Sequence, residues 1–121
     1  MSLFSSLFGG GNPAGRPKIE EVDAATVRQW QKNGECLLID VREDREYRME
    51  RIAGSHLAPL SRLEQSLPSW SAGVKAVFLC QSGARTRMQA GRLAGCGAET
   101  AYILRGGMMG WKASGLPVER G

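Results

Sequence analysis

The chain has 121 residues, of which 42% are hydrophobic and 23% are charged, as expected of one globular domain with an ordinary core. The net charge is +4 without a run of five like charges, so the composition does not predict nucleic-acid binding. No apolar run approaches the length of a membrane span, and the three cysteines, which include no C-x-x-C pair, predict neither a disulfide framework nor a structural zinc site. We expect a protein of the reducing cytoplasm.

Residues 1–17 have the composition of a flexible N-terminal tail. The large apolar residues within 3–8 would share one face of a short helix, and the linker GGGNPAGRP follows them. A lone helix of this length is not stable in water, so one interpretation is a disordered tail. The other is that residues 3–8 dock on a membrane surface, on a partner or on a second copy of the chain.

Strands and helices alternate through the predicted folded domain, residues 18–121. Asp23 is predicted to cap a helix that ends near Gly34. The charged stretch 42–50 favours a short helix or turn. Strands are predicted at 19–22, 36–41, 74–79 and 100–104, and the second of these is a continuous apolar run of strand length.

Three further helices are predicted in the second half of the chain. Ser61 and Glu64 form an S-x-x-E capping box that would open the first of them. The second is expected over 84–96, with Gly97 at its C′ position, and the third over 108–114 after a Gly-Gly turn. Alternation of helices with nearly continuous apolar strands predicts an α/β fold, in which helices cover both faces of a mostly parallel sheet.

Cys80 follows the strand predicted over 74–79 and precedes the helix predicted from Ala84, at the edge where open α/β sheets bind ligands. The backbone N–H groups between them can turn inward as an anion-binding nest, which Gly83 permits. The nest and the helix N-terminus would lower the pKa of the Cys80 thiol and make it a nucleophile that needs no separate base. The alternative is a cysteine that only packs at a strand end.

The spacing between Cys80 and Arg85 limits what this loop can hold. Cysteine-dependent phosphatases use C-x5-R, whereas the pattern here is C-x4-R, which is one residue shorter. Ser82, Ala84 and Thr86 also keep the loop narrow. We therefore expect a loop that fits a single extra sulfur atom better than a tetrahedral phosphate.

Four segments carry a recognisable set of motifs in order: LLIDVREDREY (37–47), RIAGS (51–55), VFLCQSGART (77–86) and LRGGMMGWKASGLPV (104–118). In these segments the chain resembles the rhodanese, or sulfurtransferase, family over roughly residues 19–118. The resemblance implies a three-layer α/β fold with a central, mostly parallel sheet. It also implies a catalytic cysteine that carries sulfur as a persulfide.

By position in these motifs, the persulfide cysteine is Cys80. The resemblance suggests that Asp40 supports the active loop by accepting backbone N–H bonds. We expect Arg42 to pair with Glu46, four residues further on. Arg85 either braces the loop backbone or attracts an anionic donor. The loop that would bind the outer sulfur or an anion comprises Gln81, Ser82, Gly83, Ala84, Arg85 and Thr86.

Four other conspicuous side chains are assigned no catalytic role. The only histidine, His56, lies off the family motif. Cys36 and Cys96 are interpreted as small buried hydrophobes, and Trp111 as an anchor of the core.

The expected function is therefore the transfer of sulfane sulfur from a small anionic donor, such as thiosulfate, to cyanide or a thiol. A protein could replace the small donor or acceptor. Gln81 and Ser82 stand where many thiosulfate-using members carry a cation. The alternatives are a non-catalytic sulfur-relay or interaction module, and a phosphatase or arsenate reductase of related fold. The resemblance implies no metal and no organic cofactor.

Overall fold

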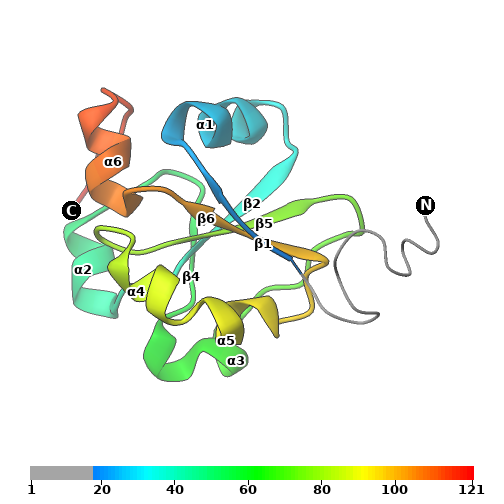
Figure 1. The fold of residues 1–121 in the computed structure, drawn as a ribbon. Helices are drawn as coiled ribbons and strands as arrows, with labels where there is room; N and C mark the ends of the chain where they lie inside the picture. Colours follow the sequence, from blue (N-terminus) through cyan, green and yellow to red (C-terminus); the bar gives the residue numbers. More distant parts are fainter. Residues whose placement is uncertain (1–17) are drawn as a thin grey trace.

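Five short strands form a parallel sheet through the middle of the protein (Figure 1). The computed structural model describes residues 18–121, so the predictions for the tail and for residues 3–8 lie outside the described residues. The strand order is β1-β6-β5-β2-β4, and every neighbouring pair in this sheet is parallel. The strands are β1 (Lys18–Val22), β2 (Cys36–Asp40), β4 (His56–Leu57), β5 (Lys75–Leu79) and β6 (Thr100–Leu104).

The middle strand, β5, explains why both faces of the sheet must be covered. Four of its five residues, Ala76 to Leu79, are buried, so side chains on both of its faces are out of water. In the sheet register Phe78 lies beside Ile39 of β2 and Ile103 of β6. The predicted α/β fold with a parallel sheet is confirmed.

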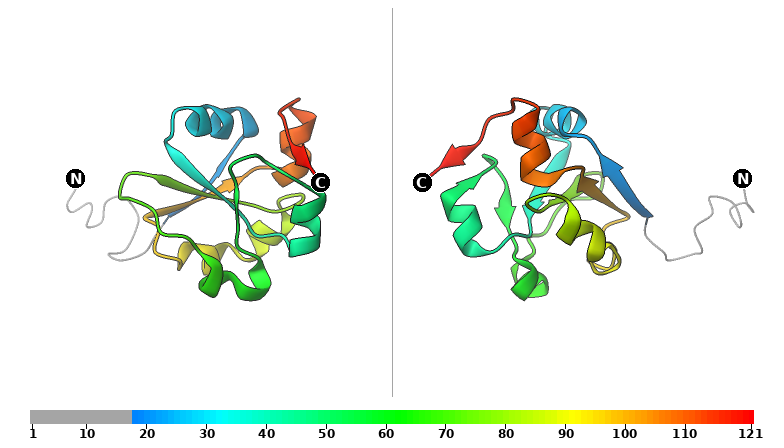
Figure 2. Two further views of the ribbon diagram at one scale, coloured as in Figure 1. Left: turned by 180° about the vertical axis from the view of Figure 1, so that it is seen from behind. Right: turned by 60° about the vertical axis from the view of Figure 1, so that its left-hand side comes forward.

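Two layers of helices provide the cover (Figures 1 and 2). One face packs against α1 (Ala24–Lys32) and α6 (Gly107–Ala113). The other face packs against α3 (Leu63–Ser66) and α5 (Ala90–Ala94). No helix within residues 18–121 is long and apolar enough to cross a membrane.

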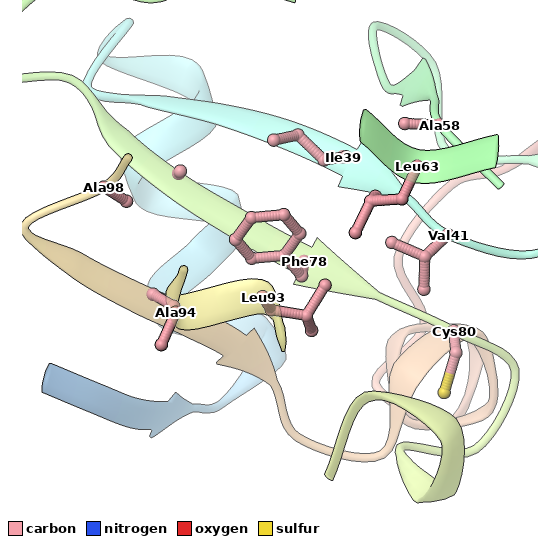
Figure 3. Close-up of a cluster of buried hydrophobic side chains, with 11 residues drawn as sticks. Ile39, Val41, Ala58, Leu63, Phe78, Cys80, Leu93, Ala94 and Ala98 are labelled. Atoms are coloured by element: carbon pink, nitrogen blue, oxygen red, sulfur yellow. The ribbon is translucent and has the colours of Figure 1, made fainter. Parts of the chain in front are cut away.

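Each layer encloses its own buried cluster. Leu63, Phe78 and Leu93 belong to the cluster that also contains Cys80 (Figure 3). Trp111 is fully buried in the other cluster, and its indole Nε1 donates to the carbonyl of Pro117 at 2.8 Å. Trp111 is therefore a core anchor, as predicted.

The remaining elements lie at one end of the sheet. Helix α2 (Asp44–Met49) follows β2, and helix α4 (Ala84–Met88) follows β5. Two short strands, β3 (Glu50–Arg51) and β7 (Glu119–Arg120), pair antiparallel beside α2. A single 3-10 turn, Leu60–Arg62, leads into α3.

The helix start predicted around Asp23 is confirmed, because its Oδ1 accepts the backbone N–H of Thr26 at 2.9 Å. The capping box predicted for Ser61 and Glu64 is wrong. Ser61 lies in the 3-10 turn, and its hydroxyl donates to the Glu43 carboxylate at 2.6 Å, so this hydroxyl does not cap the helix that follows. The capping box that the structure does contain joins Glu43 to Glu46 at the start of α2.

The single helix predicted over 84–96 is also wrong, because the backbone leaves the helical region at Gln89 (ψ 14°). Two short helices result, and each buries a side chain in a different place: Thr86 of α4 at the loop, and Leu93 of α5 on the sheet. Gly97 has the left-handed φ of +96°, but it lies in the turn beyond α5 and not directly at the helix end.

Candidate active site

Cys80 lies at the carboxyl edge of the sheet, directly after β5 and four residues before α4 begins at Ala84. Asp40, the last residue of β2, ends at the same edge as its register partner Leu79. The chain turns back at Gly83, whose φ is +96°. The structure thus places the predicted loop, residues 80–86, at the carboxyl ends of the parallel strands, where ligands bind in open α/β sheets.

The sulfur atom of Cys80 is surrounded by donors from its own loop. The backbone N–H of Gly83 donates to Sγ at 3.1 Å. The Thr86 hydroxyl lies 3.6 Å from Sγ, where either atom can donate, and it also donates to the carbonyl of Gly83 at 3.0 Å. Cys80 and Thr86 are both fully buried, so these contacts are protected from water.

Burial alone would raise the pKa of the Cys80 thiol, because it disfavours the thiolate. Hydrogen bonds from the backbone and hydroxyl of Thr86, and from the backbone of Gly83 and Ser82, outweigh burial and lower this pKa below its ordinary value. Burial raises the pKa of Cys36 to about 11 and also raises that of Cys96. Cys80 therefore ionises at a lower pH than the other two cysteines.

Cys36 and Cys96 are half-buried, not fully buried as expected. Each still packs against one of the two apolar clusters, and neither belongs to the 80–86 loop. These positions fit the interpretation of both cysteines as packing residues. A raised pKa keeps each thiol neutral, and the neutral form is the one that packs against apolar side chains.

The N-terminus of α6 fixes the direction of the loop peptides. The backbone N–H of Met108 donates to the carbonyl of Cys80 at 2.9 Å, and that of Met109 donates to the carbonyl of Gln81 at 3.0 Å. In a planar trans peptide the N–H points opposite to the C=O, so the N–H groups of Gln81 and Ser82 face away from α6. This orientation explains why the Ser82 backbone acts on the Cys80 thiol.

Gly107 is what allows α6 to approach so closely. A Cβ atom at this position would lie 2.2 Å from the carbonyl oxygen of Cys80, a distance that atoms do not tolerate. Gly107 and the preceding Gly106 both have a positive φ, +55° and +76°. The Gly-Gly pair is therefore a packing requirement of the loop as well as a turn.

Asp40 reaches the loop only through Arg42. The Asp40 carboxylate accepts the backbone N–H of Arg42 at 3.0 Å and its guanidinium at 2.8 Å, and both side chains are buried. Arg42 then donates to the Gln81 side chain at 3.2 Å and to the carbonyl of Glu50 at 2.7 Å. The predicted Arg42–Glu46 pair is wrong, because a buried guanidinium needs a buried counter-charge and Asp40 supplies it.

Glu46 is paired with Arg85 instead. The guanidinium of Arg85 donates to both carboxylate oxygens of Glu46, at 2.9 and 2.7 Å, and so joins α4 to α2. These bonds hold the pKa of Glu46 at about 2. Arg85, and not the Arg42 that the sequence predicts, is thus the partner of Glu46.

Two hollows in the described surface differ in their position relative to the loop. One of about 350 Å³ lies beside the loop and is lined by Arg42, Glu46, Met49, Glu50, Gln81 and Arg120. A larger one, of about 620 Å³, includes Lys75 and Thr100, which begin β5 and β6, so it lies at the opposite edge of the sheet from Cys80. The smaller hollow is at the edge of the sheet that holds the perturbed thiol, although Cys80 itself does not line it.

His56, which is assigned no catalytic role, lies away from the loop. His56 is exposed on β4, with Nε2 3.2 Å from the carbonyl of Ser66. Within residues 18–121 no three His, Cys, Asp or Glu side chains group closely enough to hold a metal ion.

Comparison with known proteins identifies relatives of this fold. A family model described as a rhodanese-like domain matches residues 23–114. The uncharacterized protein slr1261 of Synechocystis sp. is 36% identical over 92 residues, which cover 76% of this chain. Those residues are 51% of that protein, so the chain spans about half the length of this curated relative.

Solved structures agree in fold. The thiosulfate sulfurtransferase of Pseudomonas aeruginosa superposes with a TM-score of 0.75 at 24% identity, over 88% of this chain and 20% of that chain. A Rhodopseudomonas palustris protein of unknown function, described as a possible tyrosine phosphatase, gives 0.70 at 27% identity, over 84% and 85% of the two chains.

Replacing Thr86 with Val should raise the pKa of the Cys80 thiol, because the hydroxyl near Sγ is lost at nearly constant volume. The thiolate of the parent is present above its lowered pKa, so in the variant the alkylation rate of Cys80 should rise only at higher pH. At a fixed pH below that pKa, we expect about a tenfold slower rate, the effect of one lost hydrogen bond to a charged group. Thr100→Val on β6 is the control. An unchanged pH profile would contradict the assignment.

Replacing Gly107 with Ala should displace α6 from the loop and abolish rapid alkylation of Cys80. Overpacking of this kind costs about 3 kcal/mol. Gly97→Ala is the matched control, since Gly97 also has a positive φ, +96° against +55° for Gly107, but no atom lies within 4 Å of its Cβ position. It should cost only about 1 kcal/mol of backbone strain. Thermal unfolding measures both losses, and equal losses would show that the contact with the Cys80 carbonyl is unimportant.

Proposed function

This chain belongs to the rhodanese-like family, and on that basis we propose that it is a sulfurtransferase that carries sulfane sulfur on Cys80. The observation that supports this most directly is the environment of Sγ: a buried sulfur with a lowered pKa, bonded to backbone N–H groups of its own loop. A thiolate is the form that attacks sulfur.

In the first half-reaction the Cys80 thiolate attacks the outer sulfur of a donor such as thiosulfate. A bond forms between Sγ and that sulfur, the sulfur–sulfur bond of the donor breaks, and sulfite leaves with its electron pair. Arg42 and Arg85 are both engaged by carboxylates, which favours backbone donors over these two guanidinium groups in this step. The donor is held by the loop amides instead.

In the second half-reaction a nucleophile takes the outer sulfur from the Cys80 persulfide. The loop N–H groups that lower the pKa of the thiol are also suited to stabilise negative charge on that sulfur while it waits. Cyanide serves as the acceptor in an assay, and a small thiol or a protein cysteine in the cell. The proposed reaction needs no metal and no organic cofactor.

A phosphatase is the second candidate, because one solved structure of similar fold is described as a possible tyrosine phosphatase. The length of the loop and the pairing of its arginine argue against a phosphatase. Four residues separate Cys80 from Arg85, and Arg85 is bonded to Glu46 through both carboxylate oxygens. A phosphate in this loop would meet a shorter ring of amides and an arginine that is already neutralised.

Incubation with thiosulfate in the absence of an acceptor should add one sulfur atom to the protein, and a thiol reductant should remove it. Intact-mass analysis measures the adduct. Cys80→Ser should abolish both the adduct and turnover with cyanide while leaving the fold intact, because a hydroxyl is a much poorer nucleophile. Cys36→Ala and Cys96→Ala should keep the adduct and lose about 1 kcal/mol of stability.

Turnover of the Cys80→Ser protein within tenfold of the parent would exclude Cys80 as the sulfur carrier. Hydrolysis of an aryl phosphate that depends on Cys80, with no sulfur adduct from any donor, would favour the phosphatase instead.

A further inference from the structure

Three exposed methionines surround the loop that carries Cys80. Met49, Met88 and Met109 have 71%, 81% and 57% of their surface exposed. They come from α2, α4 and α6, the three helices gathered at the same end of the protein (Figure 1). We call these three side chains the methionine rim.

Helical spacing places two of them next to members of the ion pair that joins α2 to α4. Met49 is three residues after Glu46, and Met88 is three residues after Arg85, so each shares a helix face with its neighbour in the pair. Met49 also lines the hollow next to Gln81.

The third methionine adjoins the loop from the opposite side. The backbone N–H of Met109 donates to the carbonyl of Gln81, so the Met109 backbone contacts the loop directly. Among the large hydrophobic residues that the described surface exposes, one other is present, Ile19, near the amino end of β1. The exposed apolar side chains of residues 18–121 are therefore concentrated at the Cys80 end.

Methionine is suited to contact a protein surface of variable shape. Its side chain is unbranched and polarizable, and methionine-rich surfaces repack against different partners.

A cluster with more positive than negative charges flanks the loop on the β1 side. Glu21 faces two arginines, with N–O distances of 3.9 Å to Arg87 and 3.6 Å to Arg105. Both distances exceed hydrogen-bond length, and both guanidinium groups are more than half exposed. The guanidinium of Arg87 lies over Gly83, since a Cβ atom there would be 2.9 Å from its Nη1.

A second cluster of the same composition flanks the α2 side. Glu50 accepts from both Lys112 and Arg120, and the Glu50 and Arg120 side chains line the hollow beside Gln81. Each cluster thus joins two cations to one shared carboxylate, and Arg105 also lies near Asp23. An acidic surface would complement both clusters.

Cys80 itself is fully buried, so a partner must bring its reactive group to the loop. We propose that the methionine rim and the two basic clusters dock an acidic segment of a protein that presents a cysteine, and that this cysteine is the sulfur acceptor. The inference rests on the proposed function, because it names the second substrate of the same site.

The transfer step balances without an oxidant or reductant. The partner's thiolate attacks the outer sulfur of the Cys80 persulfide and forms a new sulfur–sulfur bond. The bond between that sulfur and Sγ breaks, and its electron pair leaves on Sγ, so Cys80 returns to the thiolate. The partner cysteine becomes the persulfide, and the negative charge that the outer sulfur carried stays on that sulfur.

Synthetic peptides test the inference without knowledge of the natural partner. The first carries one cysteine flanked by leucines and glutamates. The second replaces the glutamates with lysines, and the third replaces the leucines with serines. The full chain is loaded with thiosulfate, and the second-order rate of sulfur transfer to each peptide is measured by mass spectrometry. Each rate is divided by that peptide's rate with a small disulfide, which corrects for differences in thiol pKa.

We expect the acidic, leucine-bearing peptide to react at least tenfold faster than the other two, and its advantage over the lysine peptide to shrink at high salt. The triple variant Met49→Ser, Met88→Ser, Met109→Ser should lose the preference for leucine while loading from thiosulfate at the parent rate. Ile19→Ser is the matched control, an exposed apolar residue at the other end of the sheet, and it should behave as the parent does.

Equal corrected rates for the three peptides would overturn the inference, as would a triple variant that distinguishes the peptides as the parent does. Either result with normal loading of Cys80 would leave the proposed sulfurtransferase intact. Failure of the parent to load sulfur from any donor would instead contradict the proposed function.

Discussion

The chemistry of Cys80 depends on two hydrogen bonds that do not touch its sulfur. The N–H groups of Met108 and Met109 hold the carbonyls of Cys80 and Gln81, and so turn the following amides toward the other side of the loop. Gly107 permits this approach, and the burial of Trp111 in the apolar cluster keeps α6 in place. A segment near the end of the described chain thus determines the electrostatic environment of a cysteine in its middle.

Charged side chains hold the same loop from its other side. Arg42 is neutralised by Asp40 and contacts Gln81, while Arg85 is neutralised by Glu46. Removing one member of a buried pair leaves an uncompensated charge, which is why such pairs fix geometry more than they add stability. The loop therefore keeps its shape while Arg42 and Arg85 are paired with carboxylates, and hydrogen bonds from backbone amides and from the Thr86 hydroxyl lower the pKa of the thiol.

The sequence allowed the parallel sheet and the position of the cysteine loop to be predicted, because continuous apolar runs identify buried strands and Gly83 marks the turn. Pairing of side chains could not be predicted in the same way. Glu46 is four residues from Arg42, the spacing of a helical ion pair, yet Arg42 turns back to Asp40 because both are buried. The partner of Glu46, Arg85, is 39 residues away and becomes its neighbour only when the strands assemble. Strands of two residues, such as β3 and β7, have no periodicity to detect.

The bond between Arg85 and Glu46 also ties the length of the loop to a residue outside it. Each residue advances an α-helix by about 100° around its axis. If one residue were added between Cys80 and Ala84 and the helix absorbed it, the side chains of α4 would be displaced by this angle, and Arg85 would point away from α2. Glu46 would then face the loop as an unmatched negative charge. A longer loop would keep the Arg85–Glu46 bond only if the added residue stayed outside α4, so this bond restricts where the loop could lengthen.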